Sequence, residues 1–331
     1  MVNCLLATTA LTLSAGVAAA DVSLSGDGRM GLIYDGNDVS FTSRARVTFT
    51  LSGETDSGLA FGGSFRADNA GGAASGTAGN VFISGDFGRL AMGDVAGAAR
   101  AAVGDLHGVG LTGLGDLNEM AYIGRVIDNV DDAFAALNSD TPEFSNRPRA
   151  LYTYSIDAFS FYASVDNPVT VRDTDDSKVA SLRNVAIGAS YSFDGFTVAA
   201  GYEDARIKNF TATPTDTISA KHLIASAQYD MDGISVKAIA GRVSGDLGTF
   251  LADEDGLRRT QYGLSVSGSF DATTVTAFAN RNFATTDYGI GASYDLGGGA
   301  SFVGGIARSG SNNTLEIERN TVADLGLSFS F

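Results

Sequence analysis

The sequence has little of what several protein classes require. A single cysteine, Cys4, excludes a framework of disulfides, and four prolines among 331 residues do not describe a disordered, Pro-rich chain. No run of about 18 apolar residues follows the N-terminal segment, which excludes a later membrane-spanning helix. Basic residues are also scarce. The 22 Lys and Arg stand against 38 Asp and Glu, and the resulting net charge of −16 argues against nucleic acid as a partner.

Residues 1–20 are predicted to be a cleaved signal peptide. An apolar run at 5–17 ends at three alanines, which form a small-residue cleavage site before Asp21. The usual basic start is missing from "MVNC", so whether Met1 is the true first residue stays open. Cleavage would also remove Cys4. We therefore expect a cysteine-free mature domain at 21–331 in a bacterial envelope.

A glycine pattern after the predicted cleavage site resembles a nucleotide-binding motif only by chance. Residues 26–31, "GDGRMG", fit G-x-G-x-x-G, which needs a helix that begins at its last glycine. Instead, apolar and polar residues alternate through "DVSLSGDGRMGLIY" (21–34), which is the period of a β-strand with one apolar face. In a chain with 42 glycines such matches are expected.

The same alternation recurs along nearly the whole chain and predicts an all-β fold. Seven short turns separate the alternating segments, at 53–58, 85–89, 156–159, 194–195, 232–233, 271–273 and 295–299. Longer polar connections are expected at 166–183, 205–218, 244–259 and 309–321, and only 128–137 has a short helical pattern. Seven turns join fourteen strands, and one more strand at each terminus makes sixteen.

Short turns at one end, long loops at the other and an even number of antiparallel strands are typical of an outer-membrane β-barrel. A backbone that crosses lipid must satisfy every hydrogen-bonding group, and a sheet does so only by closing on itself. A soluble β-sandwich is the alternative, but it explains neither the regular turn asymmetry nor the terminal phenylalanine. Aromatic residues flank the short turns, as an interfacial girdle would: Tyr191, Phe193, Tyr229, Phe270 and Tyr294.

Four segments resemble the general diffusion porins of purple bacteria such as Rhodobacter: "LSGDGRMGLIYDGND" (24–38), "GDLHGVGLTGL" (104–114), "YDLGGGASFVGGIA" (294–307) and "VADLGLSFSF" (322–331). The resemblance runs through the mature chain and is strongest at its two ends. It implies a homotrimer of sixteen-stranded antiparallel barrels in the outer membrane of a Gram-negative bacterium. Each barrel would be a water-filled channel for ions and small hydrophilic solutes. The third loop, at 95–147, would fold into the lumen and constrict it.

Arginines of the first three strands are predicted to form a basic wall at this constriction. Arg29, Arg44, Arg46 and Arg66 all have the polar parity. Facing lipid, each would cost roughly 2–4 kcal/mol at the bilayer midplane, so we expect them to point into the lumen.

The third loop is predicted to supply the opposite charge. It carries eight acids and three arginines, and the resemblance implies that its acids face the arginine wall across the constriction. We assign this role to Asp105, Asp116 and Glu119. His107 replaces an aromatic residue of the family here. A transverse field of this kind would pass small polar solutes and resist apolar ones, with weak cation selectivity.

Barrel closure is expected to bring the two ends of the mature chain together. The first strand must pair with the last, which would place Asp21 near Phe331 on the short-turn side. Phe331 is also a terminal aromatic of the kind that the barrel-assembly machinery recognises. The other predicted partners are outer-membrane lipid and lipopolysaccharide.

No catalytic site, cofactor or metal centre is predicted. The chain has no G-x-S-x-G motif, and neither His107 nor His222 has metal-ligand spacing with cysteines, of which the predicted mature chain has none. Acidic segments "DTDDS" (173–177) and "ADEDG" (252–256) are candidates only for weak Ca²⁺ binding, since neither completes an EF-hand loop.

Two other functions stay open alongside a general channel. An outer-membrane adhesin or structural barrel would act through its external loops and have a plugged lumen. A substrate-specific porin would need an aromatic track that the sequence does not locate. The channel is favoured because inward arginines have no use in a sealed barrel.

Overall fold

The computed structural model describes residues 21–68, 77–124, 148–172, 178–208, 217–253 and 257–331. The predicted signal peptide and the helical pattern at 128–137 lie outside these residues. The strands are β1 (Asp21–Tyr34), β2 (Val39–Glu54), β3 (Ala60–Asp68), β4 (Thr77–Gly85), β5 (Gly88–Gly93), β6 (Arg149–Ile156), β7 (Phe159–Asp166), β8 (Val169–Arg172), β9 (Lys178–Phe193), β10 (Phe196–Lys208), β11 (Thr217–Met231), β12 (Ile234–Ser244), β13 (Thr260–Phe270), β14 (Thr273–Arg281), β15 (Thr286–Gly297), β16 (Ala300–Ser309) and β17 (Asn320–Ser330).

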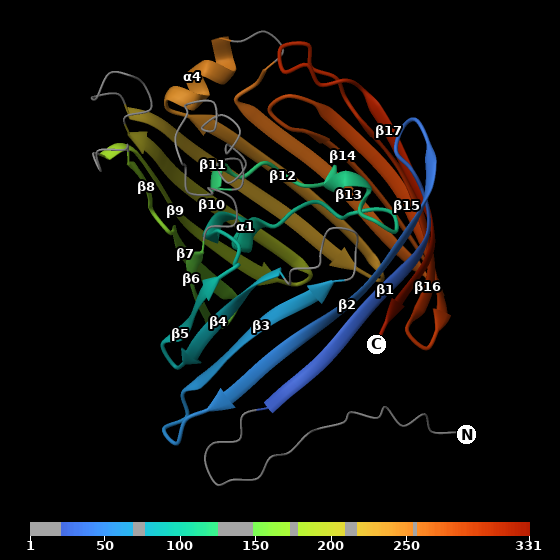
Figure 1. The fold of residues 1–331 in the computed structure, drawn as a ribbon, viewed down its shortest axis with the longest axis horizontal. Coiled ribbons are helices and arrows are strands. Elements are labelled where there is room, and N and C mark those ends of the chain that lie inside the picture. The colour runs from blue at the N-terminus through green and yellow to red at the C-terminus, as the bar shows by residue number, and fades with distance from the viewer. Residues whose placement is uncertain (1–20, 69–76, 125–147, 173–177, 209–216, 254–256) are drawn as a thin grey trace.

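The strands form one antiparallel sheet that closes into a barrel (Figure 1). β7 and β8 both pair with β9 and occupy one position in the sheet, so the barrel has sixteen strands, as predicted. They are separated at Asn167-Pro168, where proline removes a ladder donor. β1 pairs with both β2 and β17, so the sheet has no open edge there.

Turn chemistry fixes the short connections at one end of the barrel. At Asp194-Gly195 both residues have positive φ, of 45° and 80°, and at Asp232-Gly233 the values are 47° and 82°. These are the dihedrals of a type I′ hairpin turn, whose twist matches that of the flanking strands. All seven predicted short turns connect strands in the structure.

The two faces of the sheet differ as the alternation predicts. Apolar side chains of one parity point outward and are exposed: Leu24 by 65%, Phe41 by 90% and Ile187 by 61%. Polar side chains of the other parity are buried inside, Glu203 to 2% and His222 to 0%. In the described part of the chain, no helix is long and apolar enough to cross a membrane.

Aromatic residues at the short-turn end form a continuous run on the outer face. Tyr191 lies 4.3 Å from Phe159 and 5.4 Å from Phe193 between ring centroids, and Phe196 lies 4.1 Å from Tyr229. The predicted girdle residues Tyr191, Phe193 and Tyr229 thus contact one another or neighbouring rings.

The strands extend further into two of the predicted loops than expected. β8 and the start of β9 lie within 166–183, and β10 and β11 reach into 205–218 from both sides. The 244–259 connection contains a helix, α4 (Asp246–Asp253), that the sequence did not reveal. Both candidate Ca²⁺ segments lie wholly or mostly outside the described residues. Elsewhere in the described chain, no group of three or more His, Cys, Asp or Glu could hold a metal ion.

The barrel closes at Gly26 and not at Asp21. Phe331 exchanges two backbone hydrogen bonds with Gly26, of 2.9 and 3.2 Å, and its side chain is exposed. Asp21 lies five residues further along β1, opposite Ser52 of β2. The first and last strands therefore pair as expected, but their stagger separates Asp21 from the closing contact by ~16 Å of strand.

Candidate functional site

The four predicted arginines lie on the inner face of neighbouring strands. Arg29 of β1 is directly opposite Arg44 of β2, and Thr48 of β2 is opposite Arg66 of β3. Arg46 follows Arg44 with the same parity. The sequence assignment of these residues to one inward cluster is therefore consistent with the register of the sheet.

Two strand acids neutralise much of this cluster. Arg44 donates to Asp27 at 2.6 Å. Arg46 binds Asp68 through two hydrogen bonds of 3.0 Å, and Arg66 also lies 3.0 Å from Asp68. Sequence reasoning missed both acids as partners, although Asp27 and Asp68 share the parity of the arginines beside them. These ion pairs hold the guanidinium groups in place against the wall.

The third loop begins with α1 (Ala98–Val103), and Arg149 of β6 holds this start of the loop against the wall. Arg149 of β6 forms a bidentate ion pair with the buried Asp166 and donates to the Val95 carbonyl at 3.0 Å. The Ala98 amide donates to Ser164 at 2.8 Å. These contacts fix the start of the loop against β6 and β7.

Glycines of the wall let α1 lie directly on the strands. In Figure 1 the sheet curves around α1. A Cβ atom at Gly188 of β9 would lie 2.6 Å from the Ala102 Cβ, and one at Gly201 of β10 would lie 2.6 Å from the Ala99 Cα. The alanines of α1 and the glycines of the wall are thus complementary in size, which allows this close contact.

The middle of the loop crosses to the last strand. The Leu111 and Thr112 amides donate to the two carboxylate oxygens of Asp324 in β17, at 2.9 and 2.6 Å. The chain then turns through η1 (Leu114–Asp116), and Asn280 of β14 donates to the Leu117 carbonyl at 2.6 Å. The segment therefore contacts β17 and β14 of the wall.

His107 is held between two hydroxyl groups of the wall. Its Nδ1 lies 2.8 Å from Ser265 Oγ of β13, and its Nε2 lies 3.2 Å from Ser235 Oγ of β12. Burial, together with the charge of Lys237, lowers the pKa of His107 below its ordinary value. The ring is therefore neutral near pH 7 and exchanges hydrogen bonds with the two serines.

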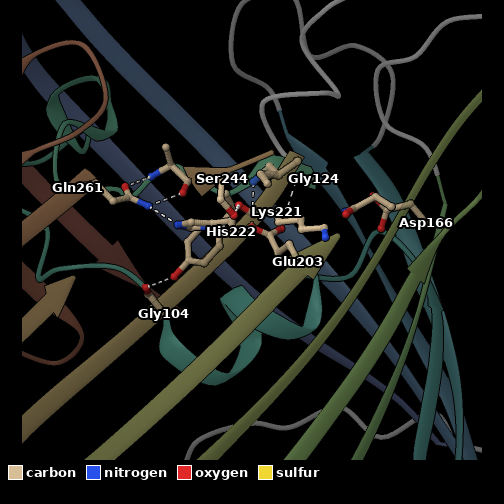
Figure 2. A network of polar contacts seen from close by, with 12 residues as sticks. Gly104, Gly124, Asp166, Glu203, Lys221, His222, Ser244 and Gln261 are labelled. Carbon is tan, nitrogen blue, oxygen red and sulfur yellow. Dashed lines mark hydrogen bonds and ion pairs between the residues drawn. The ribbon is translucent and has the colours of Figure 1, made fainter. Parts of the chain in front are cut away.

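A buried polar network holds the end of the described segment (Figure 2). Glu203 of β10 accepts from the Ile123 and Gly124 amides at 2.9 and 3.2 Å and lies 2.9 Å from His222 Nδ1. Gln261 of β13 lies 2.9 Å from His222 Nε2. Because an amide nitrogen can only donate, His222 accepts at Nε2 and donates from Nδ1 to Glu203.

Gln261 completes this network by pairing with the loop backbone. Its Oε1 accepts from the Ala121 amide at 2.9 Å, and its Nε2 donates to the Ala121 carbonyl at 2.7 Å. No functional role was predicted for His222 from the sequence. Its polar parity was the available signal, but its partners are distant in sequence.

Two of the predicted loop acids are tied to an arginine of the loop itself. Arg100 donates to Asp105 at 2.9 Å and to Glu119 at 2.8 Å, and Asp105 also accepts from the Met120 amide. Asp116 is exposed at the turn of η1, with a φ of 56°. The remaining acids of the loop lie outside the described residues.

Tyr122 joins the end of the described part of the loop to the residue that follows α1, Gly104. Its hydroxyl donates to the Gly104 carbonyl at 2.6 Å, and burial raises the pKa of the phenol. The hydroxyl therefore stays protonated and keeps this bond across the physiological range.

The comparisons with known proteins agree with this architecture. The Gram-negative porin family matches residues 7–314. The chain belongs to this family. It is 40% identical over 324 residues to the porin of Rhodobacter capsulatus, an alignment that covers 94% of this chain and 100% of that protein. The porin of Fuscovulum blasticum is 29% identical over 336 residues, with the same coverage.

Solved structures match this porin along the same length. One porin structure is 37% identical with a TM-score of 0.70, and the match covers 94% of this chain and 100% of that chain. A variant of the Rh. blastica porin, 22% identical with a TM-score of 0.60, has the same fold. The family and the sixteen-stranded barrel place this porin in the outer membrane of a Gram-negative cell, which it crosses with its strands.

Proposed function

We propose that this porin is a general diffusion channel whose narrowest part lies between the arginine wall of β1–β3 and the third loop. The arrangement of the loop carries this proposal. Its anchors Ser164, Glu203, Ser265 and Asp324 lie on strands from β7 to β17, whereas the arginine cluster lies on β1–β3. A loop held to one part of the wall narrows the lumen without filling it.

The charges support selection by polarity. The wall carries four arginines against Asp27 and Asp68 and is therefore positive, while Asp105, Asp116 and Glu119 lie on the loop. We propose that these loop acids face the wall across the opening. The ion pairs of Asp105 and Glu119 with Arg100 reduce this field, so we expect weak selectivity for cations, which fades with salt as screening increases.

Passive diffusion is tested by liposome swelling with neutral sugars of increasing size. We expect swelling rates to fall smoothly as solute size increases, with no saturation. Saturable swelling for one sugar class would instead indicate a substrate-specific porin. Absence of swelling with folded, inserted protein would favour the adhesin or structural barrel.

We further propose a homotrimer embedded in outer-membrane lipid and lipopolysaccharide, assembled through recognition of Phe331 by the barrel-assembly machinery. The exposed terminal ring beside Phe329, at 6.5 Å between centroids, supports a recognition role. We propose no catalytic activity and no cofactor, with at most weak Ca²⁺ binding at the acidic segments. Analytical ultracentrifugation in detergent tests the trimer, and a monomer that conducts at the same unit conductance would refute it.

A further inference from the structure

The outer face of the barrel carries a basic belt at its loop end. Arg242 is opposite the exposed Leu223, Arg281 is opposite Tyr262, and Arg308 is opposite Tyr288. Because residues paired across strands share a face, these arginines point outward with the lipid-facing side chains. The belt consists of Arg183, Lys221, Arg242, Arg281 and Arg308.

This belt contrasts with the rest of the molecule. The whole chain has a net charge of −16, and the short-turn end of the same face carries the aromatic run at Tyr191, Phe193 and Tyr229. One acid with the outward parity, Asp204, is already paired with Arg206 at 3.0 Å. Positive charge is therefore concentrated at one height of the membrane-facing surface.

A cavity of about 360 Å³ lies within the belt, where β14–β17 meet the loop end of the barrel. Three guanidinium groups line it, from Arg281, Arg308 and Arg319, together with Tyr288 and the hydroxyls of nearby Ser and Thr. Arg281 donates to Thr286 at 2.8 Å, which orients its side chain. No carboxylate is among the lining residues.

Two acids adjoin lining residues in sequence. Glu318, just before Arg319, is exposed and is not among the lining residues, and Asp287, between Thr286 and Tyr288, points to the opposite face. Asp287 is buried on the inside, where its carboxylate accepts from the Asn282 side chain at 3.0 Å and the Gly310 amide at 3.1 Å. Among the described residues, none of the three cavity arginines forms an ion pair with a carboxylate. Three such cations side by side repel one another unless an anion joins them.

We propose that this cavity binds a phosphate group on a lipid headgroup of the outer leaflet. Guanidinium groups hold phosphate oxygens in bidentate hydrogen bonds, and three of them match a doubly charged group. The loop end of a porin barrel faces the outside of the cell, so the cavity lies at the height of the outer-leaflet headgroups. Tyr288 beside it is an aromatic of the kind that anchors at this interface.

The test is binding of lipid A to the purified full-length protein in detergent, followed by native mass spectrometry. Phosphorylated lipid A is compared with enzymatically dephosphorylated lipid A and with inorganic phosphate. We expect the phosphorylated lipid to bind roughly tenfold or more tightly than the dephosphorylated form, and R281Q/R308Q to abolish this preference. R89Q is the matched control, because Arg89 lies over Phe82 at the short-turn end and away from the cavity.

Each outcome bears on the proposal. Equal binding of both lipids, or unchanged preference in R281Q/R308Q, would overturn it. Binding of inorganic phosphate as tightly as of the phosphorylated lipid would reduce the cavity to a simple anion site and overturn the lipid assignment. If the wild type shows no lipid preference and the double variant loses its oligomers, a second copy of the chain occupies the cavity and the lipid assignment is wrong. If R281Q/R308Q does not fold, R281K/R308K retains charge and should retain the preference at reduced strength, and a complete loss would count against the proposal.

Discussion

Replacing Glu203 should release the end of the third loop from the barrel wall. The carboxylate accepts hydrogen bonds from the Ile123 and Gly124 amides and from His222, and only 2% of the residue is exposed. Each hydrogen bond to a charged group contributes ~1.5–3 kcal/mol, and losing one partner leaves a buried donor unsatisfied. Water can enter from the lumen and replace part of this loss. We therefore expect Glu203→Ala to lower the free energy of local opening by about 2–3 kcal/mol.

Hydrogen exchange measured by mass spectrometry reports this change directly. A loss of about 2–3 kcal/mol corresponds to exchange roughly 30–150-fold faster at Ile123 and Gly124, with the strand amides unchanged. Glu203→Gln should have an intermediate effect, because an amide retains one acceptor oxygen and its nitrogen opposes an N–H donor. Asp204→Asn is the matched control, since this neighbour points to the opposite face and binds Arg206. Equal exchange in Glu203→Ala and Asp204→Asn would refute the anchoring role.

Three further predictions concern the wall, the terminus and the loop histidine. Neutralising Arg44 and Arg46 together to Gln should raise conductance and strengthen cation preference, because Asp27 loses its ion pairs with both arginines and Asp68 keeps only the one with Arg66. An unchanged reversal potential would remove Arg44 and Arg46 from the constriction. Deleting Phe331 should reduce the amount of assembled barrel in outer-membrane fractions, and normal assembly would argue against its role. Because the pKa of His107 is lowered in the folded protein, its stabilisation of the loop should be complete above about pH 6.5 and decline as pH falls. In His107→Gln, hydrogen exchange of the loop amides should lose this pH dependence. Wild-type protein whose loop exchange shows no such dependence between pH 4 and 8, roughly the range over which the shifted group titrates, would contradict the prediction.

Alternation and turn chemistry were sufficient to predict the barrel. Asp-Gly pairs with positive φ mark hairpins, and period-2 patterning fixes which residues face inward, including Arg44 and Arg46. Asp27 and Asp68 could have been identified in the same way, because each has the parity of the arginine it binds. The loop-side ends of β9 and β10 were not predicted, because the alternation reverses there: Leu182 and Ala205 are buried inside, whereas Arg183 and Arg206 have the outward parity.

The contacts of the third loop could not be predicted from the sequence. Asp324 binds Leu111 and Thr112 from the last strand, and Glu203 binds Ile123 from the tenth. Pairs so distant in the chain depend on the path of the loop through the barrel, which no local pattern specifies. The stagger of the closing strands is a similar case, since parity shows that β1 faces β17 but not that Phe331 meets Gly26.

Single-channel recording in planar lipid bilayers tests the central claim most directly. We predict stepwise, long-lived increases of conductance when the purified protein is added, with an ohmic response at low voltage. A salt gradient should give a small reversal potential of the sign expected for cations, which diminishes at high salt. Folded protein that inserts into the bilayer without conducting would show that the third loop seals the barrel, and the account of this porin as an open diffusion channel would be wrong.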